Sequence, residues 1–189
     1  MATVSDTPSR WSDATVYPDM WADPDSDPRN SDGPSPDGEL ATLNDYLMNY
    51  RLTLRMKCEG LSAEQLAQRS VPPSTMSLLG LLRHLAVVER DWRSWITPGE
   101  PLPTLYGARD ADFDGAAAEQ AMVEAAYADL VREQEATDAE LAGHPDLGER
   151  LGKGAIAVRE LHVHRIEEYA RHCGHADLLR ECVDGRVGQ

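Results

Sequence analysis

Residues 75–96, TMSLLGLLRHLAVVERDWRSWI, carry the strongest helical pattern in the sequence. Their apolar side chains recur at steps of three and four residues, which places them on one face of an α-helix. The apolar positions are Leu78, Leu81, Leu82, Leu85, Val88 and Trp92. Ser74 or Thr75 can cap the start of this helix, and the pattern ends near Ile96. The stretch therefore predicts a long helix with one buried face.

The rest of the chain predicts three more long helices. The first begins at Glu39 and ends before Gly60, with Leu43, Leu47, Tyr50 and Leu54 on its apolar face. Another spans roughly residues 115–142, and the last begins within residues 151–158 and ends near Val183, before Asp184 and Gly185. Four long helices without an alternating strand pattern predict an all-α four-helix bundle.

Two connections between these helices have recognisable compositions. Ser62 and Gln65 stand at capping-box spacing, which predicts one or two helical turns that end at Pro72 and Pro73. Residues 98–114 are rich in Pro, Gly and Asp, so we expect a long surface crossover, with Phe113 fixing its end.

The first 38 residues differ from all that follow. They hold half of the chain's 12 prolines, many Asp and Ser residues and almost no aliphatic side chains. Such a segment buries too little apolar surface to offset the entropy of ordering it. We therefore expect residues 1–38 to form a disordered or loosely docked acidic arm, and residues 39–189 to form the bundle domain. The alternative is that the arm's Trp11, Tyr17, Met20 and Trp21 dock on the domain or on a second subunit.

The composition of the chain disfavours several classes of function. The 189 residues carry a formal net charge of −15, which disfavours binding to nucleic acid or to an anionic membrane. Apolar runs stay far below the roughly 20 residues of a membrane span. Cys58, Cys173 and Cys182 are widely spaced, and the start of the chain lacks the order of a secretory signal. These features predict a soluble cytoplasmic protein with reduced cysteines.

The last helix has polar residues where an apolar stripe is expected. From Leu161, steps of three and four residues lead through His164, Glu168, His172 and His175 to Leu179 and Cys182. If this face points inward, an ionised carboxylate and imidazoles lie in the bundle, where unpaired burial costs several kcal/mol. A divalent metal shared by Glu168 and His172 would satisfy them, with His84 at the margin of the first stripe as the third ligand.

The spacing also allows simpler interpretations. His84 can be a hydrogen-bonded residue at the edge of the core, and Glu168 with His172 can lie on a solvated helix face. His144 and His162 have no partner at a useful spacing, so we expect both to be exposed. Cys173 and Cys182 match no zinc-finger spacing and are expected to pack in the interior.

Two segments resemble a known superfamily. Residues 57–92, KCEGLSAEQLAQRSVPPSTMSLLGLLRHLAVVERDW, and residues 164–188, HRIEEYARHCGHADLLRECVDGRVG, are similar to the signature regions of DinB-like (YfiT-like) proteins. The likeness is to the actinobacterial branch that includes the mini-circle proteins, and it covers the chain from Gly38 onward. It implies a four-helix bundle that holds one divalent metal through His84, Glu168 and His172. Zinc is expected first, with nickel or iron as alternatives.

The resemblance also implies roles beyond the ligands. His164 is expected to orient Glu168, and His175 to act as a fourth ligand or to support the others from outside. Arg165 stands where relatives usually have an apolar residue, and the segment GAIAVRELHVH lacks a common tryptophan, so substrate preferences carry over less directly.

Relatives in this superfamily include transferases that use a low-molecular-weight thiol. The resemblance therefore implies an S-transferase that joins a mycothiol-like thiol to a small electrophile at the metal. Two alternatives stay open: a non-catalytic bundle that binds metal or ligand, and a metal-dependent hydrolase that activates water in place of the thiol. A small molecule is the expected partner, and a homodimer is an open alternative.

Overall fold

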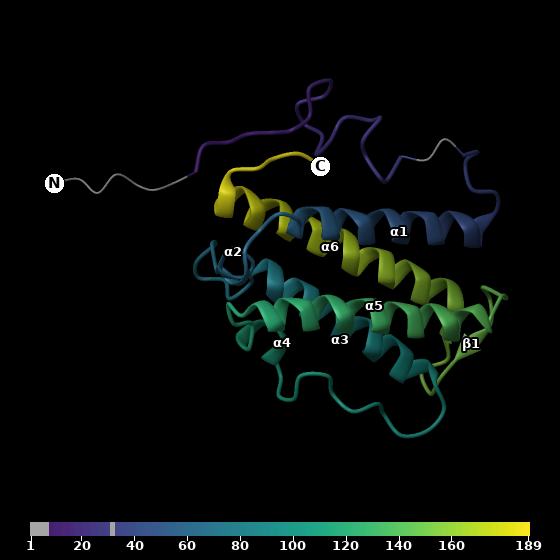
Figure 1. Cartoon of the computed structure of the whole chain (residues 1–189). Helices are drawn as coiled ribbons and strands as arrows, with labels where there is room; N and C mark the ends of the chain where they lie inside the picture. The colour runs from purple at the N-terminus through teal and green to yellow at the C-terminus, as the bar shows by residue number, and fades with distance from the viewer. Residues whose placement is uncertain (1–7, 31–32) are drawn as a thin grey trace.

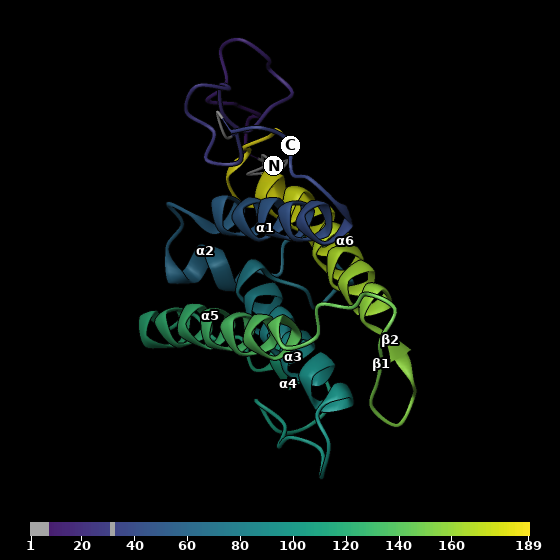
Figure 2. The ribbon, with the colours of Figure 1, turned by 90° about the vertical axis from the view of Figure 1, so that its right-hand side faces the viewer.

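The computed structural model describes residues 8–30 and 33–189. About 54% of the chain is helical, which confirms the all-α prediction. The long helices are α1 (Glu39–Cys58), α3 (Leu78–Ile96), α5 (Gln120–Ala142) and α6 (Val158–Asp184), with short helices α2 (Ala63–Ala67) and α4 (Ala111–Asp114). In Figures 1 and 2, α1 lies against α6 and α3 lies against α5, and α3 also contacts α6 across the bundle.

Local sequence signals explain three of the helix ends. The Ser62 hydroxyl accepts a hydrogen bond from the Gln65 backbone amide, and the Gln65 side-chain oxygen accepts one from the Ser62 backbone amide, which confirms the capping box at α2. Gly185 adopts φ 85° after α6, a left-handed conformation that glycine tolerates best. The cap of α3 is Ser77, whose hydroxyl accepts from the Gly80 amide at 3.0 Å, instead of the predicted Ser74 or Thr75.

Two connecting segments differ from the prediction. The crossover ends in helix α4, and α5 begins at Gln120 because Gly115 closes α4 before the chain enters the next helix. A short hairpin of β1 (Arg150–Leu151) and β2 (Ile156–Ala157) precedes α6, where no strand was expected. Each strand has two residues, which is too short to show an alternating pattern.

Leucines from α3 form the centre of the core. Leu81, Leu82 and Leu85 are fully buried between the other helices, as their spacing predicted, and Leu79, which the pattern did not include, is fully buried as well. A second group under the hairpin gathers Trp92, Ile96, Leu141, Leu151, Val158 and Leu161. Burial of this kind stabilises by about 25 cal/mol for each Å² of apolar surface removed from water.

The described part of the acidic arm, residues 8–30, packs on the domain. Trp21 is only 3% exposed, and its ring lies 3.8 Å from the Arg186 guanidinium and 4.0 Å from the Lys57 ammonium. Its backbone amide donates to the Gln189 carbonyl at 3.0 Å, beside the chain end in Figure 1. The described part of the arm therefore docks on the domain, which is the alternative that its aromatic residues left open, because cations of the domain hold the Trp21 ring. Residues 1–7 and 31–32 of the predicted arm lie outside the described residues.

Two further findings concern the whole chain. Among residues 8–30 and 33–189, none of the helices has the length and apolar character needed to cross a membrane. All three cysteines are free, with Cys58 and Cys173 buried. Cys182 is exposed, which corrects its predicted packing role, because it lies beside the buried face of α6.

Candidate metal centre

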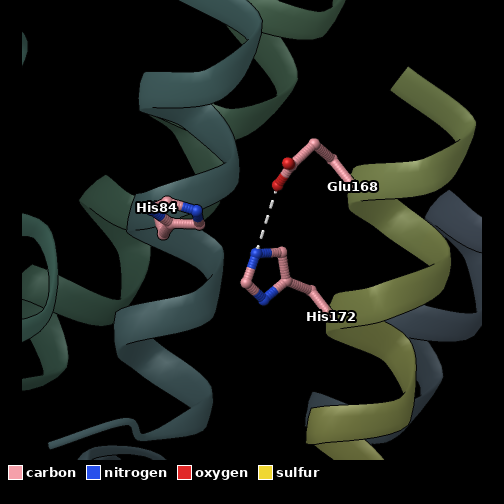
Figure 3. Close-up of side chains that lie close together, drawn as sticks. All are labelled: His84, Glu168 and His172. Atoms are coloured by element: carbon pink, nitrogen blue, oxygen red, sulfur yellow. Dashed lines mark ion pairs between the residues drawn. The ribbon is translucent and has the colours of Figure 1, made fainter. Parts of the chain in front are cut away.

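Helices α3 and α6 bring together the three residues proposed as ligands. One donor atom from each of His84, Glu168 and His172 lies within 4.8 Å of the others. Figure 3 shows the His84 ring on α3 facing the Glu168 and His172 side chains on α6. His172 Nε2 is 3.3 Å from Glu168 Oε2, and the two imidazole rings lie 4.7 Å apart between centroids. The four-residue step on α6 and the margin position on α3 thus converge on one point.

Asp112 fixes the orientation of the His84 ring. The Asp112 carboxylate lies 2.7 Å from His84 Nδ1, and the Phe113 ring stacks on the imidazole with 4.8 Å between centroids. Burial opposes ionisation of Asp112, but the hydrogen bond and charge of His84, together with backbone hydrogen bonds, outweigh it and keep the Asp112 pKa below its ordinary value. An ionised carboxylate only accepts, so the proton in this hydrogen bond comes from His84 Nδ1. Sequence reasoning missed Asp112.

His172 is held as a neutral imidazole. Burial is the main cause that lowers the pKa of His172 to about 3, and the neighbouring His84 and His175 contribute to the same shift. His175 Nδ1 lies 3.2 Å from His172 Nδ1, so one of these nitrogens donates a proton to the other. His172 Nε2 lies on the side of Glu168, and His175 lies on the opposite side of the His172 ring.

Three other histidines differ from the expectations. His164 does not support Glu168: its ring lies 3.3 Å from a Glu167 oxygen and stacks on Trp92 with 5.2 Å between centroids. His164 lies one helical turn before Glu168, but the His164 side chain points toward Glu167 and Trp92 and away from the Glu168 carboxylate. His162, expected to be exposed, is 4% exposed, and burial lowers its pKa. His144 is partly buried and lies 3.0 Å from a Glu149 oxygen.

Arg165 belongs to a second polar cluster, in the bundle interior. Its guanidinium binds Glu89 at 3.1 Å and Asp138 at 2.5 Å, and Arg51 binds the same two carboxylates at 2.8 and 2.7 Å. The Tyr169 hydroxyl donates to Glu89 at 3.1 Å. We call these five residues the buried ion-pair network. Sequence reasoning missed it because Glu89 was assigned no buried role, and Arg165 was noted only as a departure from relatives.

The donor atoms of the first cluster suit a divalent metal. Two neutral imidazole nitrogens and one carboxylate oxygen are the set used by zinc and by related metals at sites with open positions. The side chains of His84 and Glu168 are 24% and 29% exposed, so a small molecule can reach them from solvent. Asp112 and His175 give both histidines a hydrogen-bonded partner behind the ring, as metal-binding histidines usually have.

Comparison with protein families shows which family the chain belongs to. A family model described as mycothiol-S-transferase matches residues 42–185. The chain belongs to the mycothiol-S-transferase family. This family lies within the DinB/YfiT-like metalloenzyme superfamily, which confirms the resemblance seen in the sequence. No curated protein matches the chain. The family match spans both helices that carry His84, Glu168 and His172.

Proposed function

We propose that the protein is a metal-dependent S-transferase that joins mycothiol to a small electrophilic substrate. The family supports the mycothiol-related transfer. The observation that carries the metal dependence is the convergence of His84, Glu168 and His172 within 4.8 Å.

Each residue has a distinct role in this proposal. His84 and His172 offer Nε2 as neutral ligands, and Glu168 offers a carboxylate oxygen that balances part of the metal charge. A bound zinc ion would favour the thiolate form of mycothiol and hold its sulfur for attack. Three protein ligands leave coordination positions open, which distinguishes such a site from a closed structural one.

The surrounding residues hold the site in shape. Phe113 covers one face of the His84 ring, and Asp112 and His175 keep both imidazoles in fixed orientations. In the transfer, the thiol sulfur bonds to an electrophilic carbon of the substrate. The thiol proton leaves, and the carbon releases either a leaving group or the electron pair of a π bond, which then takes up a proton. The partial exposure of Glu168 gives the substrate access from solvent.

The proposal is tested by incubating the zinc-loaded protein with mycothiol and electrophiles such as monobromobimane and 1-chloro-2,4-dinitrobenzene. We expect thiol adducts to form faster than with mycothiol alone, and the acceleration to disappear in His172→Ala. The His164→Ala variant is the matched control, since it removes an imidazole from the same helix away from the cluster. Substrate loss without mycothiol would indicate a hydrolase. No acceleration by a metal-loaded protein across a broad panel would indicate a binding protein.

A further inference from the structure

A single carboxylate, outside the two helices that carry the cluster, sets the state of the His84 ring. Asp112 lies in α4, within the crossover, and its Oδ2 is 2.7 Å from His84 Nδ1. We propose that Asp112 is the positioning residue of His84: it fixes the tautomer whose Nε2 lone pair faces Glu168 and His172. This inference rests on the proposed metal site and adds to it a residue from a third segment of the chain.

The chemistry of an imidazole explains why this contact decides the ligand atom. A neutral histidine carries one N–H, and the hydrogen bond made by one ring nitrogen determines which nitrogen is left with a lone pair. A carboxylate can only accept, so it selects the proton on Nδ1. The negative charge also makes the distant nitrogen a better electron donor, and loss of such partners typically weakens metal binding 10- to 100-fold.

The fold holds Asp112 in place through Arg83, the residue that precedes His84. The buried Arg83 side chain donates from Nε to the Asp112 carbonyl and from a terminal nitrogen to the Ala111 carbonyl, both at 2.9 Å. Its guanidinium also lies 3.9 Å from the Tyr106 ring. Two adjacent residues of α3 therefore bind α4: the Arg83 side chain contacts backbone carbonyls of α4, and the His84 ring contacts the Asp112 side chain.

Gly80 permits this close approach. A Cβ atom at this position would lie 2.9 Å from Phe113 Cδ1, closer than side chains normally pack. The missing side chain lets α4 approach α3 one turn before His84, so that Phe113 stacks on the imidazole while Asp112 binds Nδ1. Neighbouring Asp114 has no such role, because its side chain is 62% exposed and only approaches Arg69 at 3.4 Å.

The first test measures the tautomer directly. Nitrogen-15 NMR of the metal-free protein, at a pH well above the ordinary imidazole pKa, reports which His84 nitrogen carries the proton. We expect Nδ1–H in the wild type and in the Asp114→Ala control, and a shift toward Nε2–H in Asp112→Ala. Retention of Nδ1–H in Asp112→Ala, or Nε2–H in the wild type, would overturn the inference.

The second test measures zinc affinity by competition with a chromophoric chelator. Asp112→Asn keeps an acceptor oxygen without the charge, so we expect it to retain the Nδ1–H tautomer and bind zinc about tenfold more weakly. Asp112→Ala should be weaker still, up to about 100-fold, and Asp114→Asn should match the wild type. If Asp112→Ala does not fold, Asp112→Leu, which fills the space without an acceptor, takes its place: a zinc affinity equal to that of the wild type would overturn the inference.

The two tests separate this inference from the proposed function. If the wild type binds no zinc, the proposed function fails, while a tautomer change in metal-free Asp112→Ala still supports positioning of the ring by Asp112. If the wild type binds zinc and Asp112 variants bind it equally well, the metal site stands and the role of Asp112 is overturned.

Discussion

Helix α6 presents two polar clusters to the bundle, and they satisfy their charges in different ways. On one flank, Arg165 joins the buried ion-pair network, where two guanidiniums face two carboxylates. On the other flank, Glu168 and His172 face His84. Among the residues that the structure describes, the two carboxylates of the network balance its two guanidiniums. In the second cluster, the Glu168 carboxylate lies beside the neutral His172, and Asp112 accepts a hydrogen bond from His84. The comparison teaches that the network balances its own charges, whereas the second cluster gathers the donor atoms on which the proposed metal site depends.

The largest effect on stability is expected from a substitution that breaks the buried ion-pair network. Glu89→Gln removes the charge at its centre and leaves the buried Arg51 and Arg165 sharing Asp138. We expect the free energy of unfolding to fall by about 3–5 kcal/mol, because an uncompensated buried charge remains. Urea unfolding of the metal-free protein measures it. Glu167→Gln, which breaks an exposed pair with Arg171, should cost less than about 0.5 kcal/mol. An equal fall in the free energy of unfolding in the two variants would show that the network stabilises the fold no more than an exposed ion pair does.

A smaller effect, which depends on metal, is expected from the second cluster. Glu168→Gln should change the stability of the metal-free protein little, because this carboxylate is partly exposed and faces a neutral imidazole. Zinc at about 100 times its dissociation constant should stabilise the wild type by about 2.7 kcal/mol, and Glu168→Gln should lose most of that gain. Unfolding curves with zinc and with chelator compare the two. The same gain in Glu168→Gln as in the wild type would contradict the role of Glu168.

The smallest effect concerns the support behind His172. His175→Ala removes the nitrogen that lies 3.2 Å from His172 Nδ1, so the zinc affinity should fall about tenfold. His164→Ala, on the same helix but stacked on Trp92, should leave the affinity unchanged. Chelator competition at matched pH distinguishes them. A larger loss in His164→Ala would mean that the outer edge of the stripe takes part in the site.

Helical spacing allowed the cluster to be predicted from the sequence. Glu168 and His172 lie one turn apart on α6, and His84 stands at the margin of the apolar face of α3, so regular geometry fixes where they point. Asp112 could not be found this way, because a connection without a period gives no direction for its side chains. Its place depends on Arg83, 29 residues earlier in the chain, donating to its carbonyl.

The buried ion-pair network shows a different limit. Glu89 on α3 and Arg165 on α6 are almost fully buried. A method that reads buried positions from apolar residues does not expect charged side chains there. Such charged residues can be buried because partners on other helices neutralise them. The sequence of a single helix therefore does not show which residues form these pairs. His162 and His164 were misplaced for a related reason: one step around the helix changes which neighbour a side chain meets.

The central claim is that His84, Glu168 and His172 bind one divalent metal. Its most direct test is the metal content of protein purified without a histidine tag, measured by mass spectrometry after zinc loading and dialysis. The wild type and His164→Ala should each hold one zinc per chain, and His172→Ala should hold almost none while keeping its helical circular dichroism. Equal metal content in His172→Ala and the wild type would contradict the account.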